Sequence, residues 1–399
     1  MMNKTGLNDT YLFFNNSVVI IIAMLLSLLK LREGGLMASE NSIKLKQIPE
    51  KYKGKTIYSF SRLGTYKECP HQYYLTYINR QKDVKENPYT YVGTSVHDVV
   101  EDLLQNKITA EEGINKFEND MLQLEIYALK YPSEQAKENL MKSIRHFIPS
   151  FKGYGAHKYA IEKEFFLEIP KDDDSDDFIV IRGFIDVISL YNNNEIEIID
   201  IKTSSKFKTA ELDEKAYQLL LYNAYIRRAF PQYKVRKLAW HMVKYCVVDD
   251  ITTKRKARII ERSKLGKELE KALRTKFAKA GTDDFETEMY IDGFKLTNNF
   301  DSLPEYIRKD YVISDWVLEY EFSEEKEENL FNYIRETVKA IESTEYKADL
   351  WKCKDIDKDM FFCQNLCPHG AGNCKHFEEW ANQNKDKVVF KNEFDDLFA

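Results

Sequence analysis

Several features are scarce or missing in this chain of 399 residues. It has only six cysteines, and it lacks a G-x-x-x-x-G-K-[ST] phosphate-binding loop. Four of the six cysteines follow a spacing typical of metal ligands, which argues against the disulfide framework of a small secreted protein. Without the phosphate-binding loop, any ATP-driven motor would be a separate protein. We therefore expect a cytoplasmic protein with a sizeable core.

Long hydrophobic runs are also scarce, and the clearest one, Val18–Leu29, lies near the start. It is shorter than the roughly 20 residues that a membrane span needs, and no small-residue cleavage site follows it. Glu33-Gly34-Gly35 can be encoded by codons that contain the core of a bacterial ribosome-binding sequence, one codon before Met37. We expect translation to begin at Met37. Residues 1–36 would then be a non-native leader read in frame, or else a hydrophobic extension, and no membrane association is expected.

The most informative pattern is a pair of apolar runs, Phe184–Leu190 and Ile196–Ile201, separated by the polar turn Tyr191–Asn194. Such a pattern predicts a β-hairpin. Further upstream, the acidic stretch Asp172–Asp177 separates two more apolar runs and predicts a solvated hairpin turn. We therefore expect a sheet rich in hairpins from about residue 158 to 202.

In the hairpin formed by Phe184–Leu190 and Ile196–Ile201, three charged side chains have a spacing that suits a metal-dependent active site. Asp186 lies near the start of one strand, while Asp200 and Lys202 end the next strand on one face. Two carboxylates that converge from paired strands suit Mg²⁺ or Mn²⁺. A lysine beside them can hold a water or stabilise charge on a phosphate. On its own, however, a D-x-K sequence at a strand end is common.

Two predicted helices supply further polar side chains. The apolar spacing from Val96 to Leu104 predicts an amphipathic helix at about 93–106 that carries His97. A second helix, at about 211–229, carries Gln218 and Tyr222 four residues apart, hence on one face. Each feature alone is ordinary in a folded protein.

Taken in order, these motifs resemble those of the PD-(D/E)XK nucleases of the RecB/AddB/Cas4 type. The G-x-x-x-H motif ends at His97, the G-x-x-D motif ends at Asp186, D-x-K ends at Lys202, and Q-x-x-x-Y begins at Gln218. The resemblance covers roughly residues 55–380. It implies an α/β, restriction-endonuclease-like core with a central mixed β-sheet flanked by helices, together with helical insertions.

The resemblance also implies a function. It implies a metal-dependent DNA exonuclease that acts on single strands or DNA ends in recombination, repair or genome processing. Lys202 would orient water and stabilise charge, while Gln218 and Tyr222 would position the strand or support Lys202. The ligands of one or two Mg²⁺ or Mn²⁺ ions would be His97, Asp186, Asp200 and the carbonyl of Ile201. A structure-selective endonuclease and a catalytically silent DNA-binding or assembly factor are the alternatives.

The cysteines carry a second resemblance. The segment around Cys69-Pro70 looks like the S-x-S-x-L…Y-x-x-C-P…Y-Y-x-x-Y opening of the iron–sulphur members of this group. Three more cysteines near the C-terminal end complete the set, namely Cys363, Cys367 and Cys374. The resemblance implies a [4Fe–4S] cluster that clips together the ends of a nuclease domain spanning 57–380.

The spacing of the last three cysteines departs from the family pattern. Each gap is one residue longer than in C-x-x-C followed by five residues. Cys353 is therefore a possible substitute ligand, and His369 or His376 could complete a Zn²⁺ site instead. Cys246 follows an apolar strand and is expected to be a buried thiol.

Charge is distributed unevenly around an overall value of −6. Residues 254–279 contain eleven basic residues and only three acidic ones, inside a basic insertion at 250–300. Such a segment favours contact with a DNA backbone, although a solvated helix explains it equally well. The candidate DNA-binding residues are Lys254, Arg255, Lys256, Arg258 and Arg262.

The remaining segments are assigned more coarsely. Residues 37–56 form a polar lead-in, and residues 381–399 form an acidic, aromatic tail that is a candidate docking peptide for a replication or recombination protein. A frayed terminus is the alternative for the tail. The other expected helices lie at 61–80, 110–129, 133–150 and Ser323–Glu342, and the other expected strands at Arg236–Val248 and Val312–Phe322.

Overall fold

The computed structural model describes residues 48–81, 87–127, 129, 131–172 and 176–384. The chain divides into two units, Met1–Lys55 and Thr56–Ala399. The described part of the first unit contains one 3-10 turn, η1 (Glu50–Tyr52). The leader expected at residues 1–36 and most of the tail expected at 381–399 lie outside the described residues. Within the described ranges, no helix is long and apolar enough to cross a membrane.

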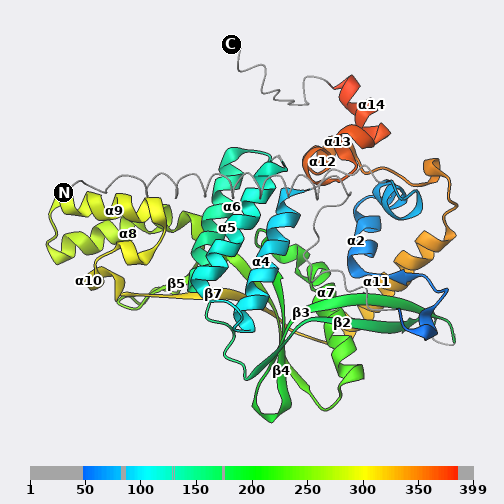
Figure 1. Cartoon of the computed structure of the whole chain (residues 1–399), viewed down its shortest axis with the longest axis horizontal. Helices are drawn as coiled ribbons and strands as arrows, with labels where there is room; N and C mark the ends of the chain where they lie inside the picture. The colour runs from blue at the N-terminus through cyan, green and yellow to red at the C-terminus, as the bar shows by residue number, and fades with distance from the viewer. Residues whose placement is uncertain (1–47, 82–86, 128, 130, 173–175, 385–399) are drawn as a thin grey trace, which may run out of the picture. The chain divides into compact units, whose positions relative to one another are not determined.

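A seven-stranded mixed sheet forms the centre of the second unit (Figure 1). The strand order is β1-β3-β4-β5-β6, with β2 beside β3 and β7 beside β5. The pairs β1–β3 and β4–β5 are parallel, and the other pairs are antiparallel. The strands are β1 Ile57–Tyr58, β2 Lys158–Pro170, β3 Phe178–Leu190, β4 Glu195–Lys202, β5 Lys234–Asp250, β6 Arg258–Glu261 and β7 Tyr311–Tyr320. The predicted α/β class with a central mixed sheet is confirmed.

Helices cover the sheet on both faces. One core contains Ile198, Leu238 and Trp240 together with residues of α2, α7 and α11. A second core contains Val187 and Ile199 together with residues of α4, α5 and α6, which lie side by side in Figure 1. These helices are α2 Phe60–Glu68, α4 Pro88–Leu104, α5 Ala110–Ile126, α6 Glu134–Ser150, α7 Leu212–Ala229 and α11 Glu324–Ser343.

The remaining helices form the insertion after β5 and the C-terminal region. The insertion has its own apolar core, which includes Leu269, Phe277 and Phe294. Its helices and those that follow are α8 Leu265–Ala280, α9 Asp284–Thr297, α10 Glu305–Arg308, α12 Ile356–Phe361, α13 Gly370–Asn373 and α14 Lys375–Gln383. Short turns connect the elements: η2 Tyr74–Ile78, η3 Asn192–Asn194, η4 Thr209–Glu211, η5 Arg262–Lys264, η6 Phe300–Ser302, η7 Ala348–Leu350 and η8 Phe362–Leu366.

Both predicted hairpins are present, because β3 pairs with β2 on one side and with β4 on the other. At the tip of the β3–β4 hairpin, Asn193 and Asn194 adopt left-handed φ angles of 58° and 57°. Asparagine tolerates this conformation better than most residues, so the polar turn fits its position. The acidic turn between β2 and β3 lies partly outside the described residues.

The predicted helices are present with two changes: one helix begins earlier than expected, and one is broken in its middle. Helix α4 begins at Pro88 rather than near 93, because the Asn87 side chain accepts the Tyr89 N–H at 2.8 Å and caps the helix. The helix expected at 61–80 is broken at Cys69, which has extended φ and ψ angles and is followed by Pro70. The proline starts the short helix α3 (Pro70–Tyr73). As predicted, Ser323 caps α11.

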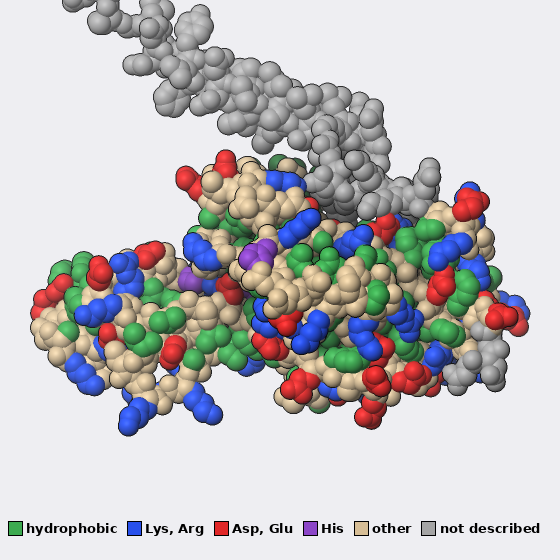
Figure 2. All heavy atoms as spheres, turned by 90° about the horizontal axis from the view of Figure 1, so that it is seen from below, with side chains coloured by type: hydrophobic (Ala, Val, Ile, Leu, Met, Phe, Trp, Pro, Cys, Tyr) green, Lys and Arg blue, Asp and Glu red, His purple; other side chains and the backbone are tan. Residues whose placement is uncertain are grey.

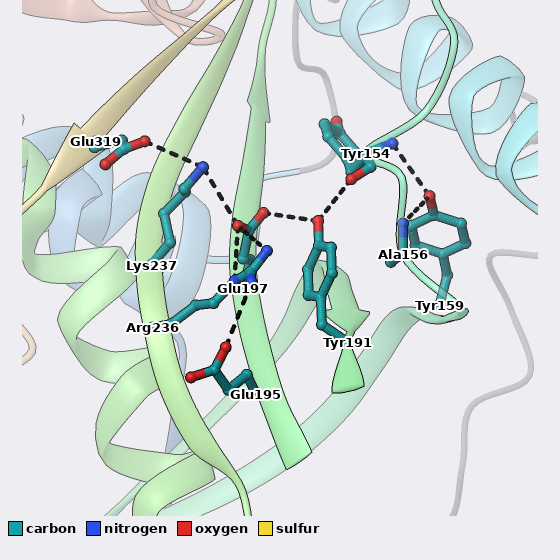
Figure 3. Close-up of polar contacts among 9 residues, drawn as sticks. All are labelled: Tyr154, Ala156, Tyr159, Tyr191, Glu195, Glu197, Arg236, Lys237 and Glu319. Carbon is teal, nitrogen blue, oxygen red and sulfur yellow. Dashed lines mark hydrogen bonds and ion pairs between the residues drawn. The ribbon is translucent and has the colours of Figure 1, made fainter. Parts of the chain in front are cut away.

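A buried carboxylate fixes the parallel pairing of β4 with β5 (Figure 3). Glu197 accepts from Arg236 Nη2 at 2.9 Å and lies 3.3 Å from Lys237 Nζ, and the Tyr191 hydroxyl also donates to it at 3.0 Å. Lys237 in turn reaches Glu319 on β7 at 3.1 Å. These contacts join β4, β5 and β7 near the start of β4. The other end of β4 carries Asp200 and Lys202.

Candidate active site

The predicted carboxylates meet where β3 and β4 separate. The two strands pair as far as Val187↔Ile199, and Asp186 lies just beyond this last pair. Its Oδ2 accepts the backbone N–H of Ile201 at 2.8 Å. Because β4 continues alongside β5, Asp200 stays within the sheet while Asp186 fills the gap between the separating strands. The fork therefore brings the two carboxylates together from separate strands.

His97 reaches this fork from α4. Its Nε2 donates to the Ile201 carbonyl at 3.0 Å, and its Nδ1 lies 3.7 Å from Asp186 Oδ2. Gly93, one turn earlier, faces Thr203 just after β4, where a Cβ would lie 3.4 Å from Thr203 Oγ1, an ordinary contact distance. His97, Asp186 and the backbone of Ile201 are thus in mutual contact, and Asp200 directly precedes Ile201 on β4.

Lys202 connects the carboxylates to α7. Its Nζ lies 2.6 Å from Asp200 Oδ2 and donates to Gln218 Oε1 at 3.1 Å. Gln218 Nε2 in turn donates to the Tyr222 hydroxyl at 2.5 Å. Gln218 therefore contacts the lysine directly, and Tyr222 is connected to it through Gln218.

Asp200 provides a test of whether the site fits a cation. The residue is fully buried, its Oδ2 forms an ion pair with Lys202, and among the described residues its Oδ1 has no hydrogen-bond partner. A buried carboxylate oxygen without a partner is costly, and carboxylate oxygens are ligands that Mg²⁺ and Mn²⁺ prefer. The residues present therefore fit a divalent metal ion.

Glu162 is a member of the site that sequence reasoning missed. Its carboxylate lies 3.9 Å from His97 Nδ1, and His97, Glu162 and Asp186 each offer a ligand atom within 4.8 Å of the others. The residue has a φ of 46°, and the β2–β3 pairing skips it between Ile161↔Val187 and Lys163↔Ile185. Positive φ in a glutamate is strained and points to a functional position.

The electrostatics of the site favour a bound cation. Burial, and then the charge of Asp200, raise the pKa of Asp186 to about 7. Burial alone would lower the pKa of His97, but Asp186 and Glu162 outweigh it and raise this pKa to about 9. Asp200 likewise outweighs burial and raises the pKa of Lys202. Three carboxylates face two basic groups, which leaves negative charge for a metal ion to neutralise.

The comparison with known families agrees with this geometry. Residues 57–369 match the family model of the PD-(D/E)XK nuclease superfamily. The chain belongs to this superfamily. Its members use divalent metals, and the sheet described above is the core of their restriction-endonuclease-like fold. No protein among the curated sequences matches the chain significantly.

Metal binding in this superfamily member should depend on pH. A bound metal needs an ionised Asp186 and a neutral His97, whose pKa values are raised to about 7 and about 9. Both groups release a proton on binding, so Mn²⁺ affinity should rise at least about tenfold per unit between pH 6 and 7. Thermal-shift titrations with Mn²⁺ between pH 5.5 and 8.5 measure this slope. An affinity that is flat across this range would contradict the arrangement.

The predicted cysteine ligands surround one small cavity. It is lined by Cys353, His71 and His369 together with the four predicted ligands Cys69, Cys363, Cys367 and Cys374. All four predicted ligands are buried, as is Cys246, which lies elsewhere in the insertion core. The structure thus brings a thiol near the start of the described chain together with three near its end.

The Cys69 thiol lies in an environment suited to a metal ligand. Its Sγ accepts backbone N–H groups from Gln72 and Lys354, each at 3.4 Å. A hydrogen bond from Cys353 has the largest effect on the pKa of Cys69 and lowers it. Burial acts in the opposite direction, but the backbone donors add to the lowering, and the resulting pKa is about 6. The same neighbour lowers the pKa of Cys374 to about 7. Burial instead raises the pKa of Cys363 to about 11 and that of Cys367 to about 12, so these two thiols would release protons on binding a metal.

The longer cysteine spacing has a local structural explanation. The first gap lies in η8, a π-turn, which accommodates one more residue than an α-turn. Gly370 then passes so close to Cys363 that a Cβ would lie 1.6 Å from the Cys363 carbonyl oxygen. The additional residue therefore does not move Cys363 and Cys367 away from the cavity.

The predicted basic DNA-binding set needs one correction, because Arg262 is fully buried. Its guanidinium donates to the Val243 carbonyl at 3.0 Å, to His146 at 2.8 Å and to Asp315 at 2.5 Å. It joins α6 to β5 and β7 and cannot reach DNA. The prediction that Arg262 contacts DNA is wrong. The sequence did not indicate its burial, because the residues that bind Arg262 lie far away in the sequence.

The rest of the basic segment is largely paired or mixed with acidic residues. Arg258 binds Glu268 at 2.6 Å, and Arg274 binds Glu270 at 2.9 Å. On the face shown in Figure 2, acidic and basic side chains are interspersed over the α8–α9 region at the left. The exposed side chains that remain candidates for a DNA contact are Lys254, Arg255 and Lys256.

Replacing Arg262 with alanine should destabilise the fold. The change leaves the Asp315 carboxylate without its closest ion-pair partner, and such losses cost about 3 kcal/mol or more. Urea unfolding measures the difference, with the exposed Arg255→Ala variant as the matched control. Equal stabilities of the two variants would contradict a structural role for Arg262.

Proposed function

We propose that the chain is a metal-dependent DNA nuclease, and that it acts as an exonuclease on single strands or DNA ends. One observation carries this proposal: His97, Asp186, Asp200 and Lys202 gather at the fork of β3 and β4. Carboxylates, an imidazole and a lysine around a cation site are the groups that phosphodiester hydrolysis requires. Membership of a nuclease superfamily supports the same reaction.

The residues of the site have separable roles. A Mg²⁺ or Mn²⁺ ion, held by His97, Asp186, Asp200 and the Ile201 carbonyl, would supply Lewis-acid charge and make a bound water more acidic. The ammonium of Lys202 lies where it can orient the attacking water and balance charge that develops on the phosphate. Gln218 accepts a hydrogen bond from that ammonium and donates one to Tyr222, so the pair would support Lys202.

Glu162 completes the open side of the site. Its side chain is 44% exposed, whereas Asp200 is fully buried. It can therefore accept a proton from the attacking water or bind a second divalent ion.

We also propose that Cys69, Cys363, Cys367 and Cys374 hold a [4Fe–4S] cluster. Four cysteines that line one cavity supply the four thiolates that a [4Fe–4S] cluster takes. A Zn²⁺ site that includes His369, which lines the same cavity, is the alternative.

Two measurements test these proposals. Anaerobically purified protein should absorb broadly in the visible region, whereas bound zinc in a colourless protein would replace the cluster with a zinc site. With Mn²⁺ present, linear single-stranded DNA should be degraded while circular single strands resist. Cleavage of the circles would favour the structure-selective endonuclease, and no cleavage of either would favour a silent DNA-binding factor. A cytoplasmic role in recombination, repair or genome processing belongs to the same proposal.

A further inference from the structure

The β2–β3 hairpin continues past the catalytic fork with a regular ladder of side chains. Glu162 and Asp186 face each other where the pairing is interrupted. Two residues further along, Glu164 pairs with Phe184. Two residues further still, Phe166 pairs with Arg182. In Figure 1 the hairpin extends beyond α4, the helix that carries His97.

The side chains on this ladder form a rigid stack. Arg182 lies over the rings of both Phe184 and Phe166, at 5.5 Å and 5.8 Å from their centroids. Glu164 holds the guanidinium at 2.9 Å and 2.8 Å. Phe184 is nevertheless 43% exposed. One side of its ring is therefore supported by a fixed cation while much of the ring remains open to solvent.

The stack lies on β3, two residues from Asp186. Ile179, Ile181 and Ile185 are buried in the core with α7 and α11, so alternation makes Arg182 and Phe184 point away from that core. Val187 belongs to the other core, with α4, α5 and α6, so the face that β3 turns to each core changes beside Asp186. Phe184 is two residues from Asp186, about 7 Å along the strand. This separation suits a nucleotide next to the one whose phosphate meets the carboxylates.

We propose that Phe184, backed by Arg182, stacks on an unpaired base adjacent to the scissile phosphate. The proposal rests on the nuclease function above and defines its substrate more closely. Aromatic rings hold single-stranded nucleic acid by stacking on base faces, and this contact tolerates any sequence. A base inside a duplex has no free face to offer, so the platform selects unpaired strands or frayed ends.

The charges around the platform fit stacking better than phosphate binding. The Arg182 guanidinium is paired with Glu164, and its side chain is only 24% exposed. It therefore supports the ring and does not act as a free cation for the DNA backbone. The contribution of Phe184 to binding should consequently change little with salt, unlike that of exposed lysines.

A cycle of protein and substrate variants tests the proposal. The substrates are linear single strands with one cleavable linkage, either intact or with an abasic residue at each position near that linkage. Wild-type kcat/KM should fall about tenfold for an abasic residue at one position beside the linkage. The Phe184→Ala variant should lose about tenfold on the intact strand and lose nothing further on that abasic strand. Phe184→Trp should restore activity and sensitivity to the abasic residue.

The matched control is Phe285→Ala, which removes a ring that is 83% exposed on α9. It should behave like the wild type on every substrate. If the effects of Phe184→Ala and the abasic residue add instead of overlapping, the ring does not hold that base and the proposal is wrong. Equal behaviour of Phe184→Ala and Phe285→Ala would overturn it as well.

Binding separates this inference from the nuclease proposal. Fluorescence anisotropy of a labelled single strand with the Asp200→Ala variant, without divalent metal, requires no cleavage. Adding Phe184→Ala to that variant should weaken binding about tenfold, and adding Phe285→Ala should leave it unchanged. If the wild type cleaves nothing while this difference appears, the nuclease proposal fails and the platform stands.

Discussion

Replacing Lys202 with methionine should lower kcat for DNA cleavage at least about 100-fold, with Mn²⁺ saturating. The Lys202 ammonium is fixed between Asp200 and Gln218, and it is the cation of the site that keeps its charge throughout the pH range of the reaction. Methionine keeps most of the side-chain length and removes the charge. The variant would therefore lose the charge that stabilises the phosphate, and the buried Asp200 carboxylate would also lose its ion-pair partner.

The control for this prediction is Lys208→Met. Lys208 follows β4 by a few residues, and its side chain is 84% exposed. Rates are measured on linear single strands, and circular dichroism checks that both variants fold. Lys202→Met activity within twofold of the wild type would remove the basis of the nuclease proposal, because a silent binding factor loses nothing when this lysine is replaced.

The catalytic fork could be predicted from sequence because its determinants are local. The apolar runs around Asp186 and Asp200 specify two strands, and the polar turn between them specifies their pairing. Once β3 and β4 form a hairpin, Asp186 and Asp200 must lie near each other. Helical spacing likewise fixes Gln218 and Tyr222 on one face, and both are found in contact with Lys202 or with each other.

Glu162 could not be predicted because nothing local distinguishes it. In the sequence it alternates with Glu164 in a half-polar strand, as many surface residues do. Its role depends on a positive φ and on a break in pairing opposite Asp186, and both arise from the way β2 crosses the fork. Tertiary geometry, not residue pattern, places it in the site.

For Arg262, the sequence suggested a contact with DNA that the burial of the residue excludes. A run of basic residues predicts a solvated, positively charged surface, yet this arginine is buried against Asp315 and His146. Those partners are 53 and 116 residues away in the sequence. Local charge density cannot reveal a partner contributed by another part of the chain, so a charged segment must be examined residue by residue.

If the proposed [4Fe–4S] cluster is present, replacing Cys374 with serine should remove it and destabilise the second unit by about 5 kcal/mol. In the folded chain Cys374 shares this cavity with Cys69, so a cluster here closes a loop of about 300 residues. Loops of that length gain the most from a covalent or metal clip. Treating the wild type with an iron chelator should reproduce the loss, because the clip depends on the metal and not on the thiol alone.

Two further cysteines make this prediction specific. Cys246 is also fully buried but lies in the insertion core, so Cys246→Ala should keep the full iron content and visible absorbance. Cys353 contacts Cys69 and Cys374 at the cavity, so Cys353→Ala distinguishes a neighbouring thiol from a ligand. If Cys353→Ala loses the metal while Cys363→Ala retains it, the ligand set changes but the clip remains. If Cys374→Ser keeps both metal and stability, Cys374 is not a ligand and the prediction is wrong.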